Sequence, residues 1–193
     1  MKISGYVNDK NGLGVEGATV EIKNDDFETL YQTCSNSDGS YEIITQDGKY
    51  PFLVSVKNYG EENLEYWCQN IDLSRDIRLD IFFDKLEIYG LHVFSVKGAY
   101  PSLMVYFRPM SLEKFKNGDA DIAPDMRDIC VEIDNSKVEI YSKNKVGEFI
   151  GDRVLTAYLL QVALPSGQSD WKSLSVEICD ENYNYGKADI FNS

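Results

Sequence analysis

The chain has 193 residues, with 32 Asp and Glu against 19 Lys and Arg, and a formal net charge of −13 at pH 7. This balance disfavours sequence-independent nucleic-acid binding and attachment to anionic membranes, because both need a basic face. The length suits two compact domains, and a hydrophobic content of 43% is enough to build their cores. The many aromatic residues, 13 Tyr and 9 Phe, favour strands.

The start of the sequence shows no export signal. Met1-Lys2 leads directly into a strand-like run, without an apolar core region or a cleavage site. No window approaches the roughly 18 apolar residues of a membrane span, so we expect no membrane insertion. As written, the chain is expected to be cytoplasmic. It would be extracellular or periplasmic if an export signal had been trimmed from it.

Alternating apolar residues predict several short strands in residues 2–84. The faces that share this alternation are Ile3, Gly5 and Val7; Ala18, Val20 and Ile22; Tyr41 and Ile43; Phe52, Val54 and Val56; and Ile77, Leu79, Ile81 and Phe83. Turn signals at residues 24–26, 37–39 and 47–48 separate them. Short strands at this spacing predict an antiparallel sandwich, and no segment here has both the length and the periodicity of a helix.

An ordered series of motifs resembles the carboxypeptidase regulatory-like domain over residues 2–82. The motifs are Gly5-Tyr6-Val7-Asn8-Asp9-Lys10-Asn11-Gly12, Val15-Glu16-Gly17-Ala18-Thr19-Val20, Ser37-Asp38-Gly39-Ser40-Tyr41 and Tyr50-Pro51-Phe52-Leu53-Val54-Ser55-Val56. Tyr59-Gly60 stands where the family usually has Gly-Tyr. The resemblance implies a seven-stranded, transthyretin-like (prealbumin-like) sandwich. It also implies a non-catalytic module of the kind appended to peptidases, glycan-handling proteins and outer-membrane receptors.

The second half continues with strand-like runs at residues 86–96, 103–107, 128–133, 137–141, 154–164, 173–180 and 186–191. The last two runs resemble the closing hairpin of bacterial immunoglobulin-like domains. One short helix is predicted at residues 111–118, with Ser111 as its N-cap and Gly118 at its C-terminal end. We therefore predict an all-β chain of two antiparallel β-sandwiches in tandem, a transthyretin-like one at residues 1–84 and an immunoglobulin-like one at residues 85–193. Without a flexible linker between them, they should pack rigidly together.

The four cysteines are Cys34, Cys68, Cys130 and Cys179. They form no CxxC motif, and the chain has one histidine, so a structural zinc site is not expected. The strand phase places Cys130 and Cys179 in the polar register, which disfavours a buried disulfide of the immunoglobulin type. We expect free thiols, with a cross-strand bridge within one sheet as the alternative.

No catalytic constellation is evident. Nucleophilic triads of the Ser-His-Asp or Cys-His type need a histidine, and His92 lies within a predicted strand, where a packed or edge position is the simpler interpretation. No spacing of lysines or carboxylates suggests another reaction. We predict that the chain is not an enzyme.

Asp119, Asp121 and Asp125, with Asp128 close behind, form the best candidate for a metal site. Carboxylates on a loop are ligands that Ca²⁺ prefers, and a negative field would help to capture the ion. The spacing matches no EF-hand loop, so a solvated acidic loop is the alternative. No other cofactor is expected.

Five aromatic residues are candidates for ligand contact: Tyr183, Tyr185, Trp171, Trp67 and Tyr66. Exposed rings beside Asn and Asp can hold a sugar by stacking and hydrogen bonding, and Tyr183 and Tyr185 alternate onto one face near a turn. The alternative is that these rings are packing residues with a polar tip at the surface.

These features predict a non-enzymatic binding or scaffolding module that contacts a protein or glycan partner. One alternative is a structural subunit of a surface or secretion assembly that joins through sheet edges. An enzyme is the third possibility. The sequence does not fix the oligomeric state.

Overall fold

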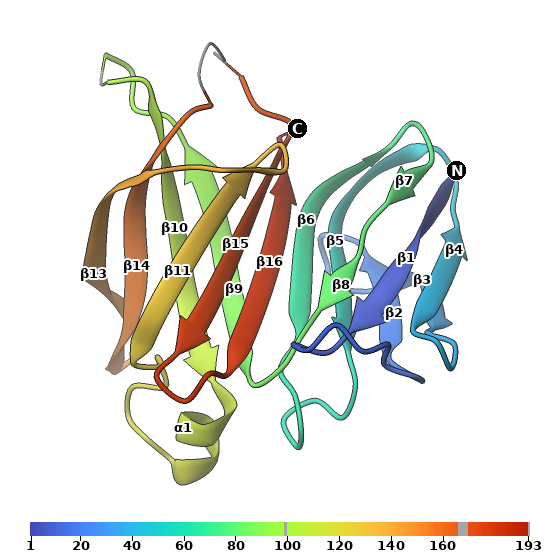
Figure 1. Ribbon diagram of the computed structural model, residues 1–193, viewed down its shortest axis with the longest axis horizontal. Helices are drawn as coiled ribbons and strands as arrows, with labels where there is room; N and C mark the ends of the chain where they lie inside the picture. The colour runs from blue at the N-terminus through green and yellow to red at the C-terminus, as the bar shows by residue number, and fades with distance from the viewer. Residues whose placement is uncertain (99, 166–169, 193) are drawn as a thin grey trace.

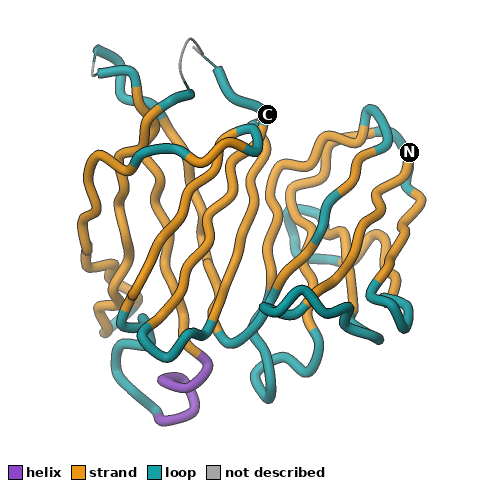
Figure 2. Tube along the Cα trace, in the orientation of Figure 1, coloured by secondary structure: helices purple, strands orange, loops and turns teal. Residues whose placement is uncertain are grey.

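The structure is a computed structural model that describes residues 1–98, 100–165 and 170–192. Within these residues, strands make up nearly all of the regular structure, together with one short helix (Figure 2). The fold is all-β, as predicted. It divides into two lobes, the first ending with β8 and the second beginning with β9 (Figure 1).

The first lobe is a β-sandwich. Its strands are β1 (Lys2–Asn8), β2 (Thr19–Lys23), β3 (Thr29–Cys34), β4 (Ser40–Ile44), β5 (Gly48–Val56), β6 (Tyr66–Leu73), β7 (Ile77–Arg78) and β8 (Ile81–Phe82). One layer has the order β4-β1-β7, with β8 also paired to β1, and the other has the order β6-β5-β2-β3. β3 and β6 are strands that the sequence pattern did not predict.

β7 and β8 are two pieces of one interrupted strand. Both run parallel to β1 in a continuous register, since Ile3 pairs with Ile77 and Val7 pairs with Ile81. At the interruption the carbonyl of Leu79 approaches Gly5 so closely that a Cβ atom there would lie 2.0 Å from the oxygen. Counted as one strand, they give the lobe the seven strands that the family resemblance implies. The expected antiparallel pairing is wrong for these two pieces.

The second lobe is also a β-sandwich. Its elements are β9 (Leu86–Phe94), β10 (Ser102–Ser111), α1 (Leu112–Asn117), β11 (Met126–Ile133), β12 (Ser136–Lys137), β13 (Ile140–Ile150), β14 (Arg153–Ala163), β15 (Ser173–Asp180) and β16 (Tyr185–Phe191). One layer has the order β13-β14-β10-β9, and the other includes β12-β11-β15-β16. In chain order these layers match the ABED and CFG sheets of an immunoglobulin constant-type sandwich, with the two-residue strand β12 added beside β11. The strand order therefore confirms the immunoglobulin-like prediction.

The short helix predicted in the second lobe is confirmed. The Ser111 hydroxyl accepts a hydrogen bond from the Lys114 N–H at the start of α1, and Gly118 ends the helix with φ 74°. The turn between β11 and β12 places Asp134 and Asn135 at φ 50° and 62°, which is the left-handed geometry of a two-residue hairpin.

The two lobes share one sheet, and this was not predicted. β16 of the second lobe pairs in parallel with β6 of the first, with Ala188 opposite Trp67 and Ile190 opposite Gln69. The result is a single eight-stranded sheet with the order β12-β11-β15-β16-β6-β5-β2-β3, which runs across both lobes (Figure 1). The predicted pair of sandwiches is confirmed, and the structure adds that the two are built on a common sheet.

The two smaller sheets cover opposite faces of this shared sheet. Neighbouring residues of β6 point to opposite faces, and Tyr66 belongs to the core of the first lobe whereas Trp67 belongs to the core of the second. In β5, Leu53 and Val54 divide in the same way. Each half of the shared sheet therefore has one covered face and one open face. The small sheet of the second lobe covers one face of the shared sheet and ends at its edge strand β9. The two lobes meet there, and we call this boundary the step.

Polar contacts also join the two lobes next to the paired strands β6 and β16. The buried Tyr66 hydroxyl donates a hydrogen bond to the Asp189 carboxylate, which also accepts one from the Ser175 hydroxyl. Asp84, at the crossing between the lobes, accepts from the Tyr185 N–H at 3.0 Å and pairs with the Lys10 ammonium at 3.2 Å.

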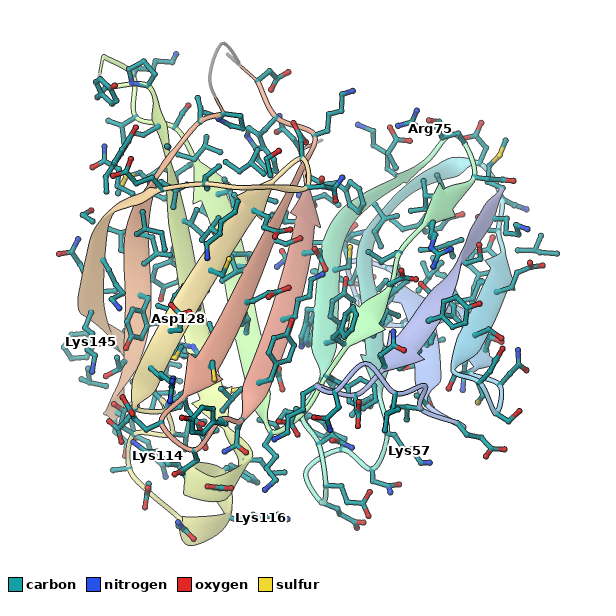
Figure 3. All side chains as sticks on the ribbon, viewed as in Figure 1. Lys57, Arg75, Lys114, Lys116, Asp128 and Lys145 are labelled. Atoms are coloured by element: carbon teal, nitrogen blue, oxygen red, sulfur yellow. The ribbon has the colours of Figure 1, made fainter. Side chains whose placement is uncertain are left out.

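The four cysteines are free thiols, as predicted. Cys130 faces Glu177 and Cys179 faces Asp128 across the β11–β15 pair, so neither lies directly opposite another cysteine. Asp128 stands on the open face of β11 (Figure 3).

Candidate binding surface

Two of the five aromatic candidates, Tyr66 and Trp67, lie in the strand β6. Tyr66 was expected at the surface, but it is fully buried, because its position on the strand turns it into the core of the first lobe. Trp67 points to the other face and keeps 8% of its surface exposed. Tyr66 is therefore not a surface residue, and Trp67 lies just beneath the surface.

The other three lie apart from these and from one another. Trp171 is half-buried and lines a cavity of about 300 Å³ together with Phe94, Asp170 and Asn192. Tyr183 is exposed in the turn before β16, with the Arg127 guanidinium 4.2 Å from its ring centre. Tyr185 begins β16 and is half-buried. The structure does not gather the five rings into one site, and their role in ligand contact stays a prediction.

The acidic loop does not assemble its carboxylates around one point. Asp121 accepts hydrogen bonds from the Thr156 hydroxyl at 2.7 Å and from two backbone N–H groups, and these bonds lower its pKa despite partial burial. Asp125 pairs with the Lys114 ammonium at 3.3 Å, and Asp119 borders the same hollow near α1. Among the residues that the structure describes, no three His, Cys, Asp or Glu side chains form a metal-ligand group. Calcium binding stays a prediction without geometric support.

His92, the one histidine, lies exposed on the edge strand β9, as expected. Its ring packs at 5.6 Å from that of Phe94. No helix within the described ranges is both long and apolar enough to cross a membrane.

A cluster of aromatic rings lies at the step between the lobes, next to the edge strand β9. We call Phe27, Phe52, Trp67 and Tyr89 the aromatic junction. The Phe27 ring centre lies 4.9 Å from that of Phe52 and 5.5 Å from that of Trp67. Trp67 in turn meets Tyr89 edge-on at 5.8 Å. Three of the rings come from the first lobe and Tyr89 from the second.

The outer rings of the junction remain open to solvent. Phe27 is 48% exposed and Tyr89 is 41% exposed. The guanidinium of Arg108 lies 4.7 Å from the Tyr89 ring centre, and its charge is balanced by Glu148 at 3.1 Å. The junction therefore presents two partly exposed rings beside a buried indole, and the largely buried Arg108 guanidinium stacks on one of these rings.

Phe27 is held in a conformation that a phenylalanine rarely adopts. Its φ is 65°, in the left-handed region, where a bulky side chain is an outlier. The turn enforces this geometry, because the Asn24 side chain accepts a hydrogen bond from the Glu28 N–H at 2.8 Å and the Asn24 carbonyl accepts one from Phe27 itself. The ring is thus fixed over Trp67 by a strained but well-bonded turn.

A buried carboxylic acid lies behind the rings. Glu87 is 1% exposed and accepts hydrogen bonds from the Trp67 indole N–H at 2.9 Å and from the Glu65 N–H at 3.3 Å. Burial, reinforced by the charge of the Glu65 side chain, raises the pKa of Glu87 from 4.5 to about 7. The hydrogen bond from Trp67 opposes this rise without cancelling it.

The loop before β6 adds a further exposed ring. Tyr59 is 52% exposed, and partial burial next to Glu87 and Glu65 raises its pKa to about 12. It stands between Asn58 and Gly60, both with positive φ, and the Asn58 carbonyl accepts hydrogen bonds from the following turn. The loop is rigid, so the ring is presented in a fixed position.

Little of this surface could be predicted from the sequence. Trp67 was a candidate, but Phe27, Phe52, Tyr89 and Glu87 were not. An aromatic residue directly after the Asp25-Asp26 turn was the available signal for Phe27, since such a turn normally exposes its residues. What the surface supplies chemically is a stacking platform of partly exposed rings, with the largely buried Arg108 guanidinium and the buried Glu87 carboxyl supporting it from within.

Comparisons with solved structures give distant similarities. The chain is similar to BcpA, the major pilin subunit of Bacillus cereus, with 12% identity and a TM-score of 0.34 over 98% of this chain and 67% of that chain. It is similar to a DUF3823 family protein from Bacteroides ovatus, with 14% identity and a TM-score of 0.33 over 98% and 97% of the two chains. SGBP-B of the mixed-linkage glucan utilization locus of Bacteroides ovatus, solved with a mixed-linkage heptasaccharide, gives 12% identity and a TM-score of 0.26 over 98% and 43%. At these scores, none of them bears on the function of this chain.

No curated protein matches the sequence. The family model of the carboxypeptidase regulatory-like domain matches residues 2–78, which run from β1 through β7; β8, at Ile81–Phe82, follows directly after the match. The first lobe therefore carries the carboxypeptidase regulatory-like domain that its motifs predicted.

Proposed function

We propose that this chain is a non-enzymatic binding module that holds a protein or glycan partner against the aromatic junction. The observation that carries the proposal is the pair of half-exposed rings, Phe27 and Tyr89, fixed from two lobes over the buried Trp67. Half-exposed rings on a rigid support are the usual anchors of a binding surface, because they offer a large apolar area at a low entropy cost.

The strain at Phe27 supports a binding role over a purely structural one. A non-glycine residue held in the left-handed region costs on the order of 1–3 kcal/mol, and such residues cluster at ligand-contact sites. A ring that served only to seal the core would be more fully covered, yet Phe27 leaves 48% of its surface in water. The chain therefore keeps an unfavourable backbone conformation at Phe27, and this conformation holds the ring partly exposed.

The polar groups around the rings support a partner with both apolar and hydrogen-bonding character. The Arg108 guanidinium lies against Tyr89 and pairs with the Glu148 carboxylate, whose side chain is 36% exposed. A sugar face and a protein side chain both offer C–H groups to a ring and polar groups to its rim. The two partner classes are separated by experiment.

Trp67 provides a direct reporter for the test. The chain has two tryptophans, so a Trp171→Phe background leaves Trp67 as the sole source of indole fluorescence. A panel of oligosaccharides and a panel of peptides are titrated against this protein, and a bound partner should change the Trp67 emission. Affinity is then compared in Tyr89→Ala and Phe27→Gly, since glycine also accepts the positive φ at residue 27.

Tyr100→Ala is the matched control, because Tyr100 is a 70% exposed ring in the loop at the other end of β9. We expect each junction variant to weaken binding at least about tenfold, a change of about 1.4 kcal/mol, and the control to bind as the parent does. Equal losses in junction and control variants, or full affinity without the Tyr89 and Phe27 rings, would refute the proposal.

A further inference from the structure

An apolar slot opens between the lobes beside α1, apart from the four rings of the aromatic junction. It has a volume of about 120 Å³, and Leu64, Met110, Phe115 and Ile122 line it together with the Tyr59 ring. The Ser111 hydroxyl at its wall is already used as the cap of α1. A polar ligand would lose its hydrogen bonds to water there, so the slot suits an apolar side chain.

Both walls of the slot are fixed. One wall is the bonded turn at Tyr59, and the other is α1, on which Phe115 is 61% exposed. The Lys116 ammonium donates a hydrogen bond to the Glu61 carbonyl and so ties α1 to the turn. Lys116 lies on α1 beside the gap between the lobes (Figure 3). The slot is thus formed before anything enters it.

The same molecule carries an apolar projection at the turn between β13 and β14. Phe149 is 82% exposed, Val154 directly opposite it is 50% exposed, and the adjacent Ile150 is 39% exposed. We call these three residues the hairpin tip. A cross-strand apolar pair that is this open to water is costly to maintain in a soluble chain and marks a contact surface.

The charges of the two features are complementary. Residues 140–163 of the hairpin carry three cations (Lys143, Lys145 and Arg153) against two anions (Glu148 and Asp152), a net charge of +1. The loop at residues 57–65, which forms one wall of the slot, carries one cation against three anions, a net charge of −2. The other wall, α1, carries two cations against one anion, so the two walls together have a net charge of −1. The hairpin is therefore a slightly basic segment and the slot a slightly acidic one, within a chain of net charge −13.

We propose that the hairpin tip of one copy of this chain occupies the slot of a second copy. The tip lies on the outer edge of the second lobe, where Lys145 marks β13, and the slot lies between the lobes (Figure 3). The tip and the α1 wall of the slot belong to the same packed second lobe, so one copy cannot bring its own tip into its own slot. The contact is heterologous, because two different surfaces meet, and such contacts extend into chains when the rotation does not close.

Two charge variants and one matched control test the contact. Phe149→Asp removes the tip, Phe115→Asp blocks the slot, and Tyr100→Asp adds the same charge at a ring of similar exposure elsewhere. All three side chains are largely exposed, so each variant should fold, which circular dichroism verifies. Molar mass is measured by light scattering across a wide concentration range in the presence of reductant.

We expect the mass of the parent chain and of Tyr100→Asp to rise above 22.0 kDa with concentration, while Phe149→Asp and Phe115→Asp each remain monomeric. Mixing the two monomeric variants should restore a one-to-one complex, because one supplies an intact slot and the other an intact tip. A parent chain that stays monomeric at every concentration overturns the proposal, as does a mixture that fails to associate. Binding at the aromatic junction, measured in Phe149→Asp, is unaffected by either result.

Discussion

Glu87→Gln tests the electrostatics of the step between the lobes. In the folded chain the Glu87 carboxyl is buried and its pKa is raised from 4.5 to about 7, so the folded state binds a proton more tightly than the unfolded state. Stability from this group is fully present below pH 4.5 and is lost as the pH rises through about 7. Glutamine keeps an oxygen for the Trp67 indole N–H but does not ionise.

The size of the effect follows from the two pKa values. The difference between about 7 and 4.5 corresponds to about 3 kcal/mol, at about 1.4 kcal/mol for each pH unit. Of this, about 2–3 kcal/mol should be lost between pH 5 and pH 8, because the group in the unfolded chain is already largely ionised at pH 5. Over this range Glu87→Gln should therefore gain about 2–3 kcal/mol relative to the parent chain.

Urea unfolding with reductant, followed by tryptophan fluorescence at pH 5 and pH 8, measures the difference. Any loss from replacing the second carboxylate oxygen is independent of pH and cancels between the two conditions. The exposed Glu16→Gln makes the same charge change and should follow the parent chain at both pH values. A Glu87→Gln difference that is equal at pH 5 and pH 8 would refute the reasoning.

Three further predictions concern the packing of the two lobes. Asp189→Ala should lower the free energy of unfolding by about 1–3 kcal/mol, because it leaves the Tyr66 hydroxyl buried without an acceptor. Adding Tyr66→Phe to this variant should recover part of the loss. If urea unfolding shows that the two losses simply add, the prediction is wrong. Gly5→Ala should lower the free energy of unfolding by about 1–3 kcal/mol or more, and the thermal midpoint with it, because its Cβ would lie 2.0 Å from a backbone oxygen. An unchanged thermal midpoint would disprove the contact. In thiol labelling followed by mass spectrometry, the exposed Cys34 should react in the native chain, whereas Cys68, buried and with a raised pKa, should react only on unfolding.

Much of the fold could be predicted from local signals. The alternation at Val20 and Ile22 turned these side chains inward, and Ser111 and Gly118 bounded α1 where their capping chemistry indicated. The strand phase also placed Cys130 on a polar face. Each of these features depends on residues close together in the sequence, and their physical reasons are readable there.

β6 escaped prediction because it faces two different cores. Its alternate residues pack into the first and second lobes, so Tyr66 and Trp67 are apolar side by side and the strand shows no clear alternation. β3 was missed for the opposite reason, since as an edge strand it buries little. The parallel pairing of β6 with β16 joins Trp67 to Ala188, a separation that no local pattern encodes.

The candidate site was harder to predict than the fold for the same reason. The junction brings Phe27, Trp67 and Tyr89 together from a turn and two strands in different lobes. The burial of Glu87, which sets its pKa, depends on that arrangement and not on its sequence neighbours. Single aromatic residues can be selected from the sequence as candidates. The surface that they form together can be recognised only when the pairing of β6 with β16 is known.

The pairing of β6 with β16 also determines how long β6 lacks its neighbouring strand while the chain is being synthesised. β6 ends at residue 73 and β16 at residue 191, so 118 residues (191 − 73) separate the two ends. At about 5–20 residues per second, synthesis leaves the edge of β6 without its neighbour for about 6–24 s. During that interval a nascent first lobe offers an open row of backbone donors and acceptors to any other extended chain. The interval of greatest exposure to misassembly is therefore set by the translation time of the second lobe.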